Sequence, residues 1–115
     1  MLHGGWRGLA GGIVAAAVRA LRELGVEGEL EAAIGPGAGG CCYETGEEVR
    51  EVFAAHPASS GRLLDLPAVA AAQLREQGVT TVHDIGACTI CDERFFSHRR
   101  EGAATGRQGG FAWLR

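Results

Sequence analysis

The chain has 115 residues, 46% of them hydrophobic and 22% charged, which suffices for one folded domain and leaves no room for a second core. Its 11 basic residues, all arginine, are outnumbered by 14 acidic ones, and no segment gathers the positive charge that nucleic-acid binding needs. The longest apolar stretch, residues 9–18, is interrupted by glycines and falls short of the roughly 18 residues of a membrane span. Since no signal-peptide cleavage pattern follows it, we expect a cytoplasmic protein without nucleic-acid or membrane partners.

The first half of the chain predicts one helix and one strand. Apolar residues recur at helical spacing from Leu9 to Leu24, which predicts an amphipathic helix that stops at Gly25. The short apolar run 30–34 predicts a buried strand. It leads into residues 35–40, whose glycine content predicts a loop.

The second half predicts two helices, a strand and an irregular tail. We expect helices over residues 47–55 and from Asp65 to Gly78, the latter because Asp65 can cap a helix with proline in its first turn. The β-branched run 79–85 predicts a strand, whereas the tail is expected to be irregular until a short apolar strand at 111–114. Strands separated by helices predict a layered α/β or α+β architecture without an internal linker.

The turn from His3 to Gly8 places an imidazole, an indole and a guanidinium at the start of a helix. Helix N-termini favour anions, and arginine matches phosphate or carboxylate, so this turn is a candidate anion-binding or metal-binding corner. The alternative is a frayed terminus with an exposed histidine.

The four cysteines, which a cytosolic protein would keep reduced, form two groups. Cys88 and Cys91 have the two-residue gap of zinc knuckles and redox motifs, although one such pair is a weak signal. Cys41 and Cys42 are adjacent, which we expect to hinder their sharing one tetrahedral ion. A four-cysteine zinc site is therefore the lesser hypothesis, and we expect at least two of the four to be buried as small apolar side chains.

Arginines gather in the tail, where Arg99, Arg100 and Arg107 are candidate phosphate-binding donors held against the core by the preceding Phe95 and Phe96. The alternative is a solvated charged loop. His56 and His83 show no partner pattern and are interpreted as structural.

Six motifs in this order resemble the YfiH-like laccase-domain family, also called the polyphenol oxidase or purine nucleoside phosphorylase family. They are HGGWRGLAGG, IGPGAGGCCYETGEEV, Leu64-Asp65-Leu66, CTIC, FFSHRREG and TGRQ. The resemblance implies an α+β fold, a layered mixed sheet with helices, and an active-site zinc ion. It also implies phosphorolysis of adenosine, inosine, guanosine and methylthioadenosine, with adenosine deamination as a second activity. An older label of the family, copper polyphenol oxidase, makes copper a possible metal.

Of the three metal ligands that the resemblance implies, only the histidine that opens HxGWRG is present, as His3. The resemblance therefore implies that residues 1–115 are the C-terminal portion of a single YfiH-like domain, truncated at the N-terminus. We expect the chain alone to be inactive, because catalytic zinc needs about three protein ligands. The missing half is a possible partner, and self-association is another.

Within the complete site, Arg7, Arg99, Arg100 and Arg107 are candidates for orienting phosphate or ribose, and Trp6 for shaping the pocket wall or packing under the first helix. One alternative is a non-catalytic fragment or binding module with structural zinc on its cysteines. Another, ranked last, is a thiol hydrolase.

Overall fold

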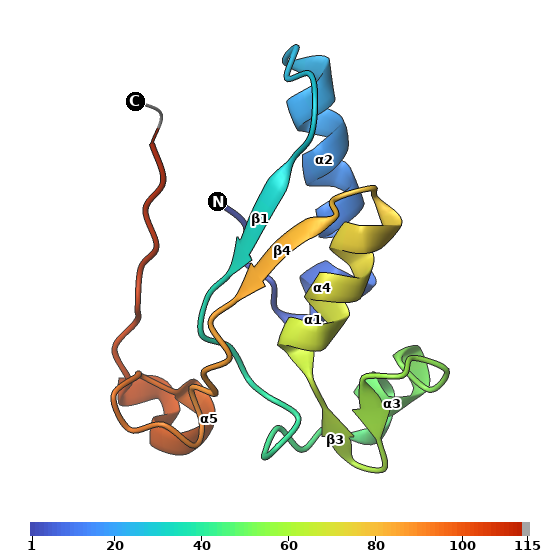
Figure 1. Ribbon diagram of the computed structural model, residues 1–115. Coiled ribbons are helices and arrows are strands. Elements are labelled where there is room, and N and C mark those ends of the chain that lie inside the picture. The colour runs from blue at the N-terminus through green and yellow to red at the C-terminus, as the bar shows by residue number, and fades with distance from the viewer. Residues whose placement is uncertain (114–115) are drawn as a thin grey trace.

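The computed structural model describes residues 1–113 and has three layers (Figure 1). A pair of parallel strands forms one side, and helix α4 (Leu66–Glu76) packs against both strands. Helices α1 (Trp6–Ala10) and α2 (Ile13–Glu23) contact α4 in turn. The expected α+β class with helices layered on a sheet is confirmed.

The first predicted helix is divided in two. Gly12 has a φ of 83°, in the left-handed region that favours glycine, and it separates α1 from α2. The two helices still share one apolar side, because Leu9 and Val14 are both buried in the core. The predicted apolar periodicity is therefore confirmed, whereas the break at Gly12 is not predicted by it.

Strands β1 (Glu31–Ile34) and β4 (Thr81–Asp84) confirm the two predicted strands, but β1 is not buried as expected, since its residues alternate between exposed and half-buried. They pair in parallel, with Ile34 opposite Asp84 at their carboxyl ends. Helix α4 provides the connection that a parallel pair requires. The Asp65 carboxylate accepts the Ala68 N–H at 3.0 Å, as expected of its N-cap.

Along the chain, helix α3 (Glu47–Val52) and a hairpin of β2 (Ser59–Ser60) and β3 (Leu63–Leu64) come between β1 and α4. The helix confirms the prediction for this region, but the hairpin was not predicted. Gly61, with a φ of 59°, forms its turn. The core joins these parts through seven buried side chains, among which Val69 is 0% exposed. They are Leu9, Val14, Tyr43, Val49, Phe53, Leu64 and Val69.

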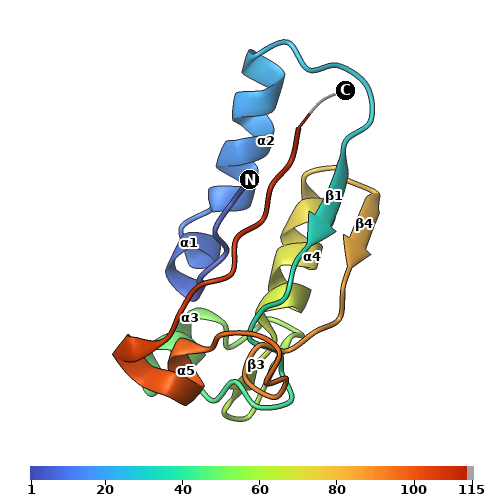
Figure 2. The same cartoon turned by 90° about the vertical axis from the view of Figure 1, so that its left-hand side faces the viewer.

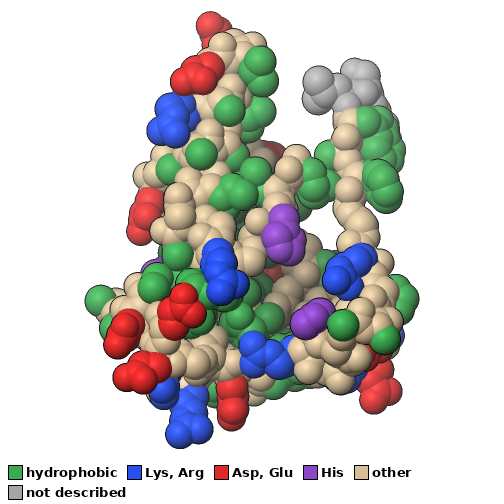
Figure 3. Space-filling view, turned by 180° about the vertical axis from the view of Figure 1, so that it is seen from behind, with side chains coloured by type: hydrophobic (Ala, Val, Ile, Leu, Met, Phe, Trp, Pro, Cys, Tyr) green, Lys and Arg blue, Asp and Glu red, His purple; other side chains and the backbone are tan. Residues whose placement is uncertain are grey.

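The tail differs from expectation in two places. It contains helix α5 (His98–Glu101) and a 3-10 turn, η1 (Gly102–Ala104), where only irregular structure was expected. Residues 111–113 form no strand, since they extend along an arm with Phe111 87% exposed, and Leu114 lies outside the described residues. Figure 3 shows apolar side chains along this arm. None of the helices among the described residues is both long and apolar enough to cross a membrane.

Candidate functional site

The four cysteines lie where the chain leaves the parallel strands. Because β1 and β4 are parallel, the segments after Ile34 and Asp84 emerge at the same edge. They continue side by side, with the Gly37 N–H donating to the Ala87 carbonyl at 3.1 Å. The Thr89 N–H donates to the Gly37 carbonyl at 2.9 Å. This pairing brings Cys41 and Cys42 next to Cys88 and Cys91.

All four cysteine sulfur atoms lie within 4.8 Å of one another. The Sγ atoms of Cys41 and Cys91 are 3.1 Å apart, and those of Cys42 and Cys88 are 3.4 Å apart. Cys42 and Cys91 are in direct sulfur contact, with Cα atoms 7.0 Å apart, and Cys41 and Cys88 are free thiols. The expectation that adjacency would keep Cys41 and Cys42 from one site is therefore wrong.

The cysteines are also less buried than expected. None of the four is fully buried: Cys41 and Cys91 are exposed, and the other two are half-buried. The expectation of small apolar core side chains was wrong because both segments lie at the edge of the sheet, outside the seven-residue core.

The two free thiols have opposite pKa shifts. Burial acts to raise the pKa of Cys88, but backbone N–H groups of Cys91, Gly39 and Ile90 outweigh it and lower the pKa below its usual value. A hydrogen bond with Cys88, followed by burial, raises the pKa of Cys41. Of the two free thiols, Cys88 is thus the one whose thiolate form the surrounding backbone stabilises.

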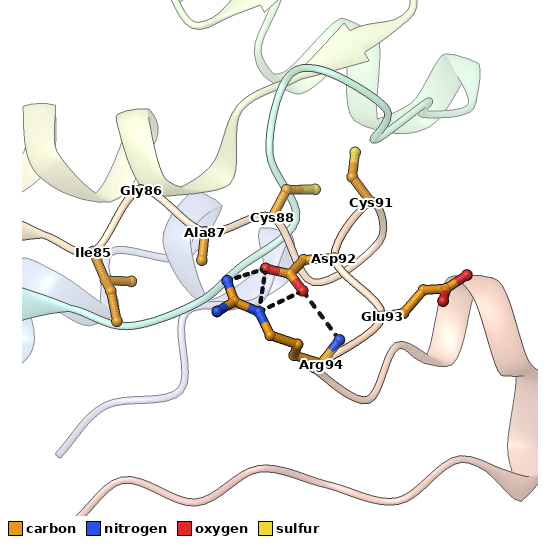
Figure 4. A pocket seen from close by; sticks show the side chains of 8 residues that line it. All are labelled: Ile85, Gly86, Ala87, Cys88, Cys91, Asp92, Glu93 and Arg94. Atoms are coloured by element: carbon orange, nitrogen blue, oxygen red, sulfur yellow. Dashed lines mark hydrogen bonds and ion pairs between the residues drawn. The ribbon is translucent and has the colours of Figure 1, made fainter.

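A surface hollow of about 600 Å³ borders the cysteines, lined by residues 85–88 and 91–94 (Figure 4). On its rim the Arg94 guanidinium forms an ion pair with Asp92 at 2.6 Å, and the hydrogen bonds from Arg94 lower the pKa of Asp92 to about 2. Figure 4 shows the side chains of Cys88 and Cys91 pointing away from this pair. The charged groups of Asp92 and Arg94 therefore bind each other and do not contact the cysteine sulfur atoms in this view.

Arg100 is committed to the backbone of the cysteine loop. Its guanidinium donates to the carbonyls of Thr89 at 2.8 Å, Ile90 at 3.0 Å and Phe95 at 2.6 Å. The first two carbonyls lie between Cys88 and Cys91. Arg100 was a candidate phosphate-binding residue, but most of its N–H donors thus bind this loop instead.

The other two tail arginines have different surroundings. Arg99 lies over the Tyr43 ring, 4.9 Å from its centroid, and donates to the Glu44 carbonyl at 2.6 Å. Arg107 is exposed, and within residues 1–113 it donates only to the carbonyls of the two residues before it. The Arg107 side chain thus remains accessible to a ligand.

The TGRQ motif is largely explained by packing. A Cβ atom on Gly106 would lie 2.8 Å from the Phe96 ring, so any larger residue would displace that ring. Gln108 accepts the Phe96 N–H and donates to the Phe96 carbonyl, both at 2.9 Å. The Thr105 hydroxyl donates to Glu101 at 2.6 Å, which is the leading cause of that carboxyl's lowered pKa. This motif therefore closes the loop that presents Arg107.

The N-terminal turn displays its polar groups. His3 and Arg7 are exposed, and Trp6 is half-buried against the core, with the Arg7 guanidinium 4.5 Å from its ring centroid. Trp6 thus packs under the first helix, and its ring also positions Arg7. Among the described residues the four cysteines are the sole group of three or more potential metal ligands, and His3 is outside that group.

The C-terminal arm brings the two ends of the chain together. It runs past the N-terminal residues (Figure 2), and a Cβ atom on Gly110 would lie 3.0 Å from the Met1 Cε atom. Met1 and Gly110 each lie two residues outside the HGGWRG and TGRQ motifs, so this contact brings together the flanks of the two motifs.

The chain is similar to several known proteins. The purine nucleoside phosphorylase of Pseudomonas aeruginosa is 42% identical, over 97% of this chain and 50% of that protein. That of Aquifex aeolicus is 41% identical, over 87% of this chain and 49% of the relative. The crystal structure of a Neisseria meningitidis protein superposes with a TM-score of 0.72 at 30% identity, covering 86% of this chain and 45% of that one.

The chain thus spans about half the length of the curated relatives that it matches. The family described as multi-copper polyphenol oxidoreductase laccase matches residues 1–115, the whole of the sequence. The chain therefore belongs to this family.

Proposed function

We propose that the chain provides half of a purine nucleoside phosphorylase site, in which the segment from His3 to Arg7 and the loop around Arg107 line the substrate pocket. The observation that supports this proposal is the closeness of Met1 and Gly110, which lie two residues outside the HGGWRG and TGRQ motifs. The names of the relatives supply the reaction. Adenosine, inosine, guanosine and methylthioadenosine are the proposed substrates, with the cytoplasm as the proposed location.

Phosphorolysis joins a phosphate oxygen to C1′ of the ribose while the bond from C1′ to the purine nitrogen breaks, and the departing base takes up a proton. Such a site must hold a phosphate anion next to the sugar. Arg7 and Arg107 are suited to this, because their side chains are exposed and their partners among the described residues are an aromatic ring and backbone carbonyls. Neither guanidinium is neutralised by a carboxylate within the described part of the chain.

A zinc ion at His3 does not fit the described residues alone, because His3 stands apart from other potential ligands. One imidazole is too few for a catalytic zinc site. The proposal therefore gives His3 a ligand role only in an assembled site, and the phosphate-binding role of the two arginines does not depend on that ion. Adenosine deamination and copper-dependent oxidation belong to the same assembled site as secondary proposals.

The test is a chimera in which this chain follows the half of the Pseudomonas aeruginosa relative that it does not match. We expect the chimera to release hypoxanthine from inosine only when phosphate is present. His3→Ala should abolish the reaction, and Arg7→Gln should lower kcat/KM on the order of a hundredfold, as expected for the loss of an anion-binding donor. Arg19→Gln, an exposed change on α2, is the matched control.

Two results would contradict the proposal. A chimera with the circular dichroism spectrum of a folded protein that releases no purine base would refute the function. Phosphorolysis that survives both His3→Ala and Arg7→Gln would refute the location of the site. Assays with adenosine without phosphate, and with a phenolic substrate and copper, decide the two secondary activities.

A further inference from the structure

A second metal site is built into the carboxyl-terminal edge of the parallel strands, separate from His3. We propose that Cys41, Cys42, Cys88 and Cys91 together bind one structural zinc ion. The ion would fasten the glycine-rich segment after β1 to the segment after β4. This inference stands apart from the proposed phosphorylase function, because none of its ligands is in the segments assigned to the substrate.

The sulfur positions suit a single tetrahedral ion. Thiolates bound to zinc at about 2.3 Å lie roughly 3.8 Å from one another in a tetrahedron. Here all four sulfur atoms lie within 4.8 Å of one another, with three contacts of 3.1, 3.4 and 3.5 Å. Cys42 and Cys91 are closer still and would have to separate to bind one ion, while the backbone pairing of the two segments holds all four cysteines in one place.

At Gly39 a side chain would press against the cysteine cluster. A Cβ atom on Gly39 would lie 3.3 Å from the Cys88 Cβ atom and 3.5 Å from the Cys41 sulfur. The Gly39 N–H also donates to the Cys88 sulfur at 3.3 Å, the kind of bond that supports a metal-bound thiolate. Gly39 is thus both a spacer and a donor for the sulfur cluster.

One guanidinium lies near the site and can offset part of its negative charge. Four thiols that bind Zn²⁺ release four protons and leave a complex with two net negative charges. The Arg100 guanidinium, bound to the Thr89 and Ile90 carbonyls, lies on the backbone between two of the ligands. Asp92, the nearest acidic residue in sequence, is already paired with Arg94. The cluster therefore has one cation beside it, which also pairs with Glu101 at 3.4 Å, and the Asp65 carboxylate lies near Gly40 on its other side.

A disulfide explains the cluster less well than a metal ion does. A bond between Cys42 and Cys91 would use two of the four sulfur atoms and leave Cys41 and Cys88 beside it without a role. The Cα atoms of that pair are 7.0 Å apart, just beyond the 4.4–6.8 Å usual for disulfides. One ion uses all four sulfur atoms, and tetrahedral coordination by four sulfurs is typical of zinc.

The experiment is metal analysis of the chain purified under reducing conditions, together with cobalt substitution. We expect one zinc per chain in the wild type and in His3→Ala. Cys88→Ser and Cys41→Ser should each lower zinc affinity about tenfold or more. Asp92→Asn, which changes a half-buried side chain next to Cys91 that is not a ligand, is the control and should keep its zinc. Gly39→Ala should weaken zinc binding without removing a ligand.

Cobalt provides a measurement on the unaltered chain, so the result does not depend on whether a cysteine variant folds. Four thiolates on Co²⁺ give strong sulfur-to-metal charge-transfer bands and the intense visible bands of a tetrahedral site. Zinc that is lost in His3→Ala but kept in both cysteine variants would overturn the proposal. So would a metal-free chain that lacks two hydrogen atoms in its mass, which indicates a disulfide, or a chain that contains iron instead of zinc.

Discussion

Replacing Arg100 with glutamine measures how far one guanidinium holds the cysteine loop in place. The wild-type side chain is 26% exposed and donates to three carbonyls, those of Thr89, Ile90 and Phe95. Hydrogen bonds from a charged group contribute about 1.5–3 kcal/mol each. Since water can reach part of the site and glutamine can replace one donor, we expect a total loss of about 2 kcal/mol in the free energy of unfolding.

The assay is urea unfolding followed by tryptophan fluorescence and by circular dichroism, with equal slopes required for the two proteins. Arg94→Gln is the matched control, because that guanidinium pairs with Asp92 and lies over the Phe95 ring on the rim of the surface hollow, without a bond to the loop carbonyls among the described residues. If Arg100→Gln changes the free energy of unfolding no more than this control does, the three carbonyls do not depend on Arg100, and our account of the loop is refuted.

Three smaller changes test other features. Ser97→Ala removes the hydroxyl that accepts the backbone N–H of Arg100 at the start of α5. It should lower the free energy of unfolding in urea by about 1 kcal/mol. Gly12→Ala should cost about 1 kcal/mol more than Gly46→Ala, because Gly12 has a φ of 83° and Gly46 one of −74°; equal melting temperatures would contradict this. Carboxyl NMR should give Asp92 a pKa of about 2, rising toward the usual value in Arg94→Gln. Its ion pair is therefore complete above the usual carboxyl pKa and lost as the pH falls through about 2, and an unchanged titration in the variant would contradict the pairing.

Elements with a strong local signal were predicted well from the sequence. Helix α4 has an aspartate cap at Asp65 and a proline in its first turn, and β4 is a β-branched run, so both needed no distant contact to be recognised. Helix α5 was missed although it has a local signal. Ser97 caps it, and Glu101 accepts the Ser97 N–H at 3.1 Å, an arrangement close to a capping box with the acid one position later.

The metal ligands could not be grouped from spacing alone. Cys42 and Cys88 are 46 residues apart, and they meet because β1 and β4 pair in parallel and leave the sheet together. The sequence does contain a signal, since a glycine-rich cysteine segment follows one predicted strand and a C-x-x-C follows the other. Parallel pairing would have placed both at one edge. The role of Arg100 could not be predicted either. Its partners are backbone carbonyls, and their positions depend on how the loop packs and not on the residue types in the sequence.

The parallel pair has a consequence for assembly. Within residues 1–113, β1 and β4 each bond to one neighbour, so each presents an outer row of backbone donors and acceptors. Such edges accept an added strand. If β1 of one copy pairs with β1 of another, the contact is isologous and closes as a dimer. If β1 pairs with β4 of the next copy, the contact is head-to-tail and can propagate into a filament. Whichever edge is covered first thus decides between a closed and an open assembly.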